Sequence, residues 1–287
     1  MIRFLDYSTK IEYNQIMRIN TDDKFNNRFG VMIILGDFIL PNQRTFWLDG
    51  LLVKLSWLDV LERTGRSTLS RMTKDGWFDV EKLGRRNRYR LTKWGETVLR
   101  QGDLRIFEQA VQEWDGKWHL LTYSLPEEKR VLRHNLVKQL SWLGYGRISR
   151  GTWLSPYDRR DPLRQALKEP DTNKFLHFFS GSYLGNTNID QLIQDCWDLE
   201  TVSGEYKRFI RYYEQVLADL RAKTNGLTAE EAFRQRFWVS YDFLPLLRLD
   251  PNLPKRFLPT PWAGFEARQL YTTFKEQVPI PPDLFSK

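Results

Sequence analysis

The chain has 287 residues, a formal net charge of +8, eleven tryptophans and a single cysteine, Cys196. This length is enough for two or three domains with a hydrophobic core each. One cysteine excludes an intrachain disulfide. The charged first fifteen residues and the lack of a run of about 20 apolar residues argue against a signal peptide and a membrane span. We therefore expect a cytoplasmic protein in which Cys196 is a packing residue.

The positive charge is concentrated in one segment. Residues 61–100 are strongly cationic, whereas residues 187–206 lean acidic. A local concentration of one sign indicates a polyanionic partner rather than a generally sticky surface.

Two helices are expected near the start, after an N-terminal extension over residues 1–27. The apolar run 28–40 ends before Pro41 and is either a buried helix or a strand, and its length favours a helix. Residues 42–45 are expected to form a loop. Leucines at near-helical spacing between residues 47 and 58 predict a second helix, followed by a turn at 57–59.

A helix with one cationic face is expected from residue 61. Leu61, Gly65, Leu69 and Met72 recur at helical spacing and predict the buried stripe, and Asp75-Gly76 ends the helix. The remaining surface carries groups that can contact guanine edges and phosphates. These candidate DNA contacts are Arg63, Arg66, Ser67, Ser70, Arg71 and Lys74.

A cationic β-hairpin follows the helix. Trp77, Phe78 and Val80 have strand character, residues 83–87 supply the turn, and apolar positions alternate again at Tyr89. Basic residues near such a turn suit a minor groove or the phosphate backbone. The candidates are Lys82, Arg85, Arg86 and Arg88. We interpret residues 28–91 as a winged helix-turn-helix DNA-binding domain. The alternative is that the charges only solvate these two elements.

The middle of the chain predicts a connecting helix over 92–114 and a second domain over 115–186. This domain has the order strand, helix, strand, strand, helix, strand, which is the split βαβ order of a ferredoxin-like domain. Its strands are expected at 118–123, 147–149, 152–155 and 175–179, with helices from Pro126 and over 161–167. Val131, Leu136, Leu140 and Leu143 are expected on the apolar face of the first helix.

Residues 187–287 predict a mainly helical domain. Helices are expected over 189–199, 206–223, 228–241 and 265–275, and prolines from Pro245 onward break regular structure between the last two. Thr228 and Glu231 have the spacing of a capping box. The chain as a whole therefore predicts an α+β protein with a winged helix-turn-helix, a ferredoxin-like α/β sandwich and a helical C-terminal domain.

Enzymatic chemistry finds little support in the residues. His119, His134 and His177 are scattered, and no metal-ligand spacing, phosphate loop, dinucleotide fingerprint or nucleophile elbow is present. We expect no cofactor, no metal and no catalytic residue. Two alternatives stay open: a metal-dependent ferredoxin-like nuclease, and a protein-interaction module without specific DNA binding.

Aromatic density beyond residue 115 raises the hypothesis of a ligand cavity between the middle and C-terminal domains. Ordinary core packing is an equal alternative for each of its residues. The candidate walls are Trp142, Trp153, Tyr183, Trp238 and Tyr241, and the candidate anion partners are Arg208, Arg211, Arg234 and Arg236.

Three groups of motifs resemble one known family over about residues 29–275. Gly65-Arg66-Ser67-Thr68-Leu69-Ser70-Arg71-Met72 with Gly76-Trp77, then Gly84-Arg85-Arg86 with Tyr89-Arg90-Leu91-Thr92, and finally Leu143-Gly144-Tyr145-Gly146 with Trp153 occur in the family's order. They are similar to the PaaX-type repressors of phenylacetate degradation. Asp250-Pro251 and Trp262 also match, whereas Tyr241, Leu244 and Pro245 stand where the family tends to carry His and Arg.

The resemblance implies a dimeric transcriptional repressor that is released by a ligand, often an aryl-acetyl coenzyme A thioester. A homodimer would bind a pseudo-palindromic operator in double-stranded DNA, because two-fold protein symmetry matches paired half-sites.

Overall fold

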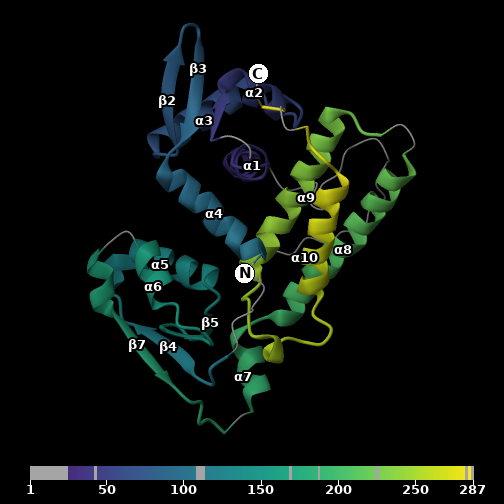
Figure 1. Cartoon of the computed structure of the whole chain (residues 1–287). Helices are drawn as coiled ribbons and strands as arrows, with labels where there is room; N and C mark the ends of the chain where they lie inside the picture. Colours follow the sequence, from purple (N-terminus) through teal and green to yellow (C-terminus); the bar gives the residue numbers. More distant parts are fainter. Residues whose placement is uncertain are drawn as a thin grey trace.

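The computed structural model describes residues 25–41, 44–107, 114–167, 170–186, 188–223, 226–281 and 284–285. Residues 1–24 of the expected extension, residues 42–43 of the expected loop and residues 108–113 of the expected connecting helix lie outside these ranges. Figure 1 shows three groups of elements: helices with a hairpin at the top, a sheet with two helices at the lower left, and long helices on the right. The mixed helix and sheet class expected from the sequence is confirmed.

The first group contains helical segments and a small sheet. Its elements are α1 (Asn27–Ile34), the π-helical turn η1 (Leu35–Ile39), β1 (Thr45–Trp47), α2 (Leu48–Ser56), α3 (Glu62–Lys74), β2 (Phe78–Leu83) and β3 (Arg86–Leu91). The strands pair antiparallel in the order β1-β3-β2. Strand β1 corrects the expected loop, because Thr45 already pairs with Arg90.

The helix α4 (Lys93–Phe107) leads from the hairpin to the second group (Figure 1). This group contains β4 (Trp118–Tyr123), η2 (Glu127–Lys129), α5 (Arg130–Trp142), β5 (Gly146–Ser149), β6 (Thr152–Ser155), α6 (Arg160–Ala166), η3 (Pro170–Phe175) and β7 (Leu176–Gly181). The strands pair antiparallel in the order β5-β6-β4-β7. This is the strand order of a ferredoxin-like sheet, as the split βαβ pattern predicts.

One face of this sheet packs against α5 and α6 around a core that includes Leu121, Leu136 and Trp153. The expectation that Val131 joins this core is wrong, since its side chain is 76% exposed and Leu132 is buried instead. On the other face, Trp118 and Leu154 belong to the core of the C-terminal helices. The sheet is therefore covered on one face by its own helices and on part of the other by the third group, whereas Phe179 of β7 is 58% exposed.

The third group is helical. It contains α7 (Ile189–Cys196), α8 (Leu199–Ala222), α9 (Ala229–Leu249), η4 (Lys255–Phe257) and α10 (Ala263–Gln277). The capping box at the start of α9 is confirmed, because Thr228 and Glu231 accept each other's backbone N–H groups. Hydrogen bonds from the Lys223 ammonium and from the backbone and hydroxyl of Thr228 lower the pKa of Glu231 to about 2. The expected break at Pro245 is wrong, since α9 continues through it to Leu249.

Helix α9 is shared between two hydrophobic cores. Phe233, Phe237 and Trp238 are buried in the core of the first group, whereas Val239 and Phe243 are buried among the C-terminal helices. In Figure 1, α9 accordingly lies between α1 and α10.

A charged cluster crosses the same boundary. The Lys275 Nζ donates to Asp37 Oδ1 at 2.8 Å, and the Ser240 hydroxyl donates to the other oxygen of the same carboxylate. The carboxylate of Asp37 is 8% exposed. The π-helical turn of the first group is therefore tied to α9 and α10 by polar as well as apolar contacts.

Cys196 is half-buried against the C-terminal core, and burial raises the pKa of its thiol to about 11. No helix among the described residues has the length and apolar character needed to cross a bilayer.

Candidate nucleic-acid interface

Helix α3 is held against α2 by a close approach at Gly65. A Cβ placed there would lie 2.8 Å from Leu52 Cδ2 and 3.0 Å from Leu55 Cδ1. Leu69 and Met72 continue the buried stripe. The expectation for Leu61 is wrong: it caps the helix and is 75% exposed, because the chain is still extended at that residue. Gly76, with φ at +82°, ends α3 as the sequence indicates.

The outer surface of α3 presents every candidate contact expected from it. Arg63, Arg66, Ser67, Ser70, Arg71 and Lys74 are all exposed. The Arg71 Nη2 donates to Ser67 Oγ at 3.3 Å, and the Arg66 Nε donates to Glu62 Oε1 at 2.7 Å. Burial raises the pKa of Tyr89 in β3, an effect that the charge of Arg66 partly offsets. Arg66 is thus on the side of α3 next to the hairpin.

The hairpin is tighter than the sequence indicates. Leu83 pairs with Arg86, so the turn consists of Gly84 and Arg85 alone, and Gly84 has φ at +61°. A positive φ at the first turn position is a conformation that glycine adopts without strain. The expected turn over 83–87 is therefore wrong at both ends, where the residues belong to strands.

Strand alternation divides the basic residues of the hairpin between its two faces. Lys82 is four residues from the buried Phe78, and its partner Asn87 is two residues from the buried Tyr89, so each pair lies on one face. Lys82 is therefore on the face of the hairpin that packs toward the core. Arg86 and Arg88 point to the opposite face. There Arg86 lies over the Trp47 ring at 4.4 Å. Arg85 occupies the tip.

Several of these cations already have carboxylate partners. Arg66 pairs with Glu62 at 2.7 Å, Arg88 with Glu81 at 2.7 Å, and Arg86 with Asp49 at 3.4 Å. Ion pairs exposed to this degree contribute about 0–1 kcal/mol, so a phosphate can displace them. Within the described ranges, no ion pair engages Arg63, Lys74, Lys82 or Arg85.

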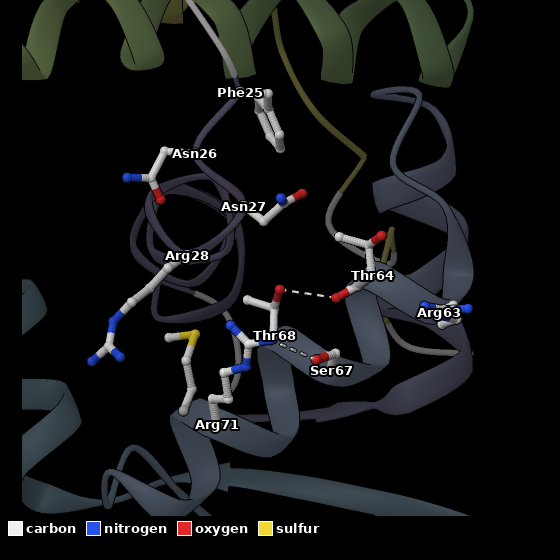
Figure 2. Close-up of a pocket in the computed structure, with 10 residues that line it drawn as sticks. Phe25, Asn26, Asn27, Arg28, Arg63, Thr64, Ser67, Thr68 and Arg71 are labelled. Carbon is white, nitrogen blue, oxygen red and sulfur yellow. Dashed lines mark hydrogen bonds between the residues drawn. The ribbon is translucent and has the colours of Figure 1, made fainter.

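A groove runs between the N-terminal end of α1 and the basic surface of α3, with a volume of about 540 Å³. Figure 2 shows Arg28 of α1 on one side and Ser67, Arg71 and Arg63 of α3 along the other. Arg28 was not among the expected contacts. No sequence signal singles it out, because it belongs to an apolar run and joins α3 only through tertiary packing.

The residues expected to line an effector cavity are spread over the molecule. Trp153 is in the core of the central sheet, and Trp238 and Tyr241 pack against Phe25 in the first group. Tyr183 packs against the C-terminal core, and the Arg248 guanidinium lies 5.7 Å from the Trp142 ring.

The expected anion partners are equally dispersed. Arg234 donates to the Trp57 carbonyl and lies 3.8 Å from Asp59. Arg236 donates to the Lys275 carbonyl, Arg208 pairs with Glu205, and Arg211 is exposed. None of these nine side chains lines the groove between α1 and α3 or the cavity described next.

A larger cavity of about 930 Å³ lies elsewhere, beside the start of α8. Trp197, Asp198 and Lys207 contribute to its wall together with Arg256 and Leu258 from the loop before α10. It combines carboxylates, two cations and apolar surface. In the part of the chain that the structure describes, no group of His, Cys, Asp and Glu side chains has a metal-binding arrangement.

Three domain descriptions of one family match the chain in order. Residues 29–95 match the PaaX-like protein, residues 111–193 the PaaX protein central Cas2-like domain, and residues 197–286 the PaaX-like protein C-terminal domain. The chain belongs to the PaaX-type regulator family. The resemblance inferred from the motifs is thereby confirmed.

Individual relatives agree with the PaaX-type assignment. The chain is 29% identical over 248 residues to the transcriptional repressor PaaX of Escherichia coli (strain K12), covering 85% of this chain and 78% of that protein. It is also similar in fold to an uncharacterised protein of Mycobacterium tuberculosis, with a TM-score of 0.57, 22% identity, and coverage of 86% of this chain and 93% of that one.

Proposed function

We propose that this protein is a transcriptional repressor that binds double-stranded DNA through α3 and the β2–β3 hairpin, used as a winged helix-turn-helix. The observation that carries the proposal is the outer surface of α3, where all six polar and basic candidates are exposed next to a cationic hairpin tip. The likeness to the E. coli repressor PaaX supports it. An enzymatic role has no comparable support.

The two elements would divide the work of recognition. In the proposal α3 lies in the major groove, where Arg66, Ser70 and Arg71 contact bases or phosphates. Lys82 and Arg85 would reach the neighbouring backbone or minor groove from the hairpin. Arg86 and Arg88, on the other face and paired with carboxylates, would contribute mainly long-range attraction.

A repressor of this design would act as a homodimer on a pseudo-palindromic operator in the cytoplasm and would block a promoter by occupying it. A small-molecule effector, such as an acyl coenzyme A thioester, would release it. The cavity beside α8 has a volume within the usual range of ligand sites, about 300–1,000 Å³. Thermal melting against a panel of such thioesters and aromatic acids tests the release proposal.

The first experiment maps the DNA that the purified protein protects upstream of its own gene and then titrates that duplex in gel shifts. Arg66→Ala is expected to reduce discrimination between this site and unrelated DNA by about 1–3 kcal/mol if the guanidinium is bidentate to guanine. Arg85→Ala is expected to weaken binding to all duplexes alike.

Arg88→Ala is the matched control, because it removes the same charge from the face of the hairpin that points away from the core and from Lys82. Wild-type affinity in both the Arg66 and Arg85 variants would contradict the docking proposal. Cleavage of short duplexes in the presence of a divalent metal ion would instead favour a nuclease, and insensitivity of binding to salt would favour a protein-interaction module.

A further inference from the structure

The groove between α1 and α3 has the composition of an anion site. Three guanidinium groups border it, those of Arg28, Arg63 and Arg71, together with the amide of Asn27 and the hydroxyl of Ser67. No carboxylate lines the groove among the residues that the structure describes. Guanidinium groups bind phosphate oxygens strongly because their donors match the spacing of two oxygens.

The arrangement of the arginines favours an extended polyanion over an isolated ion. Arg63 and Arg71 are eight residues apart on α3, a rise of about 12 Å along the helix. Arg28 lies on α1 and its guanidinium extends toward Asp75 at the end of α3, so the three groups are distributed along the groove and do not converge on one point (Figure 2). The volume of about 540 Å³ also exceeds what one phosphate group fills. A stretch of nucleic-acid backbone meets both conditions.

The α1 wall of the groove is fixed from behind by α9. The backbone N–H of Asn26 donates to the Tyr241 hydroxyl at 2.9 Å, and the Phe25 ring stacks on the Tyr241 ring with centroids 5.4 Å apart. The Asn26 side chain caps α1 by accepting from the Phe29 N–H. The positive end of the α1 dipole is thereby held at the groove, where it adds to the attraction for an anion.

Arg28 is positioned for this contact by a partner outside the groove. Its guanidinium donates to Asp75 at the end of α3 and lies 5.9 Å from the Trp77 ring. Both side chains of the pair remain about half exposed, at 46% and 48%. A guanidinium has five N–H donors, so Arg28 can keep Asp75 and still donate to a phosphate.

We infer that this groove receives the phosphate backbone of a DNA strand and that Arg28 of α1 is a phosphate contact. The inference rests on the proposed function, which it extends from α3 and the hairpin to a third element. The Tyr241 ring, whose residue was expected to bind an effector, is assigned here to positioning the α1 wall.

The experiment measures the binding of the full chain to a mixed-sequence duplex over a range of salt concentrations. A phosphate contact does not depend on base sequence, so the operator is not needed. Arg28→Gln is expected to reduce the slope of log K against log salt by about 0.9, the value for one released counterion. Arg164→Gln, which removes an arginine of α6 that is 55% exposed against 46% for Arg28, is expected to leave the slope unchanged.

A second variant tests whether the effect of Arg28→Gln on DNA binding comes only from the loss of its contact with Asp75. Asn27→Asp places a carboxylate in the groove, where it repels phosphate. It does not destabilise α1, because an acidic residue in the first turn favours a helix. It is expected to weaken duplex binding without lowering the melting temperature. If the wild-type protein binds DNA and both variants keep its salt slope and affinity, the inference about the groove is overturned but the proposed function is not. No DNA binding by the wild-type protein would instead overturn the proposed function.

Free phosphate is tested separately at constant ionic strength. The melting temperature is expected to rise by the same amount in the wild type and in Arg28→Gln when sodium phosphate replaces sodium chloride, because phosphate stabilises folded proteins in general. If phosphate raises it more in the wild type than in Arg28→Gln, and the salt slope is unchanged, the groove binds a free anion and its assignment to the DNA backbone is wrong.

Discussion

Three arginines of the proposed interface, Arg66, Arg86 and Arg88, have carboxylate partners before any DNA arrives. Arg66 is bound by Glu62, one turn earlier on α3, with side chains 50% and 66% exposed. In the proposed docking, a DNA phosphate or base would therefore compete with a carboxylate that also repels the phosphates around it. At this exposure the pair itself adds little to stability.

Glu62→Gln is expected to tighten binding to every duplex, because it releases Arg66 and removes a negative charge from the interface. Anisotropy titration at fixed salt measures the change. Glu200→Gln is the matched control, since it also removes a carboxylate from the first turn of a helix, α8, away from α3. Weaker binding in Glu62→Gln would mean that the carboxylate is needed to orient Arg66 for DNA.

At the scale of single elements, two helical glycines differ in what surrounds them. A Cβ added to Gly204 in α8 would meet no neighbouring element within 4 Å among the described residues, whereas one added to Gly65 in α3 would meet Leu52 at 2.8 Å. Alanine in a helix interior is favoured over glycine by about 1 kcal/mol. The surroundings decide whether that gain is realised.

Gly204→Ala is expected to raise the free energy of unfolding by about 0.5–1 kcal/mol, measured by urea denaturation. Gly65→Ala is expected to gain less or to lose stability, because α2 and α3 must separate slightly. Equal stabilisation by both substitutions would show that α2 and α3 can separate slightly at almost no cost in free energy.

Periodicity and turn residues predict the elements whose structure is decided locally. The pattern Gly65, Leu69, Met72 and the terminator Gly76 suffice for α3. Strand β1 escapes such reasoning because its three residues are stabilised by partners in β3, at Arg88 to Arg90, far away in the sequence.

Pro245 shows the opposite limitation. Proline removes a backbone donor and usually ends a helix. Here Phe243, Leu246 and Leu247 are all buried on α9, and this packing outweighs the local cost. Aromatic content likewise indicates that tryptophans are buried, but it does not indicate in which core. The sequence therefore could not assign Trp153 and Trp238 to different cores.

At the scale of the molecule, the Asp37–Lys275 pair joins the first group to α10. The side chains are 8% and 20% exposed, so the pair is more nearly buried than those of the interface. Among the described residues, removing Lys275 leaves the Asp37 carboxylate with only the Ser240 hydroxyl and the charge of Arg236 to compensate it.

Lys275→Met is expected to lower the free energy of unfolding by about 3 kcal/mol, at the low end for buried pairs because Lys275 is partly exposed. Asp37→Asn combined with Lys275→Met is expected to recover part of this loss. Urea denaturation followed by tryptophan fluorescence measures both. An additive loss in the double variant would show that the two charges do not stabilise each other.

The sharing of α9 limits how this protein can be re-engineered. A chimera that grafts residues 25–107 onto another regulator would leave behind Phe233, Phe237 and Trp238, which cover part of the apolar surface of α1 and η1. Such a graft would expose that surface and aggregate. If α3 reads DNA as proposed, a transplantable DNA-binding unit must include α9, and specificity would be exchanged more safely by substituting residues on the outer surface of α3 than by moving the domain.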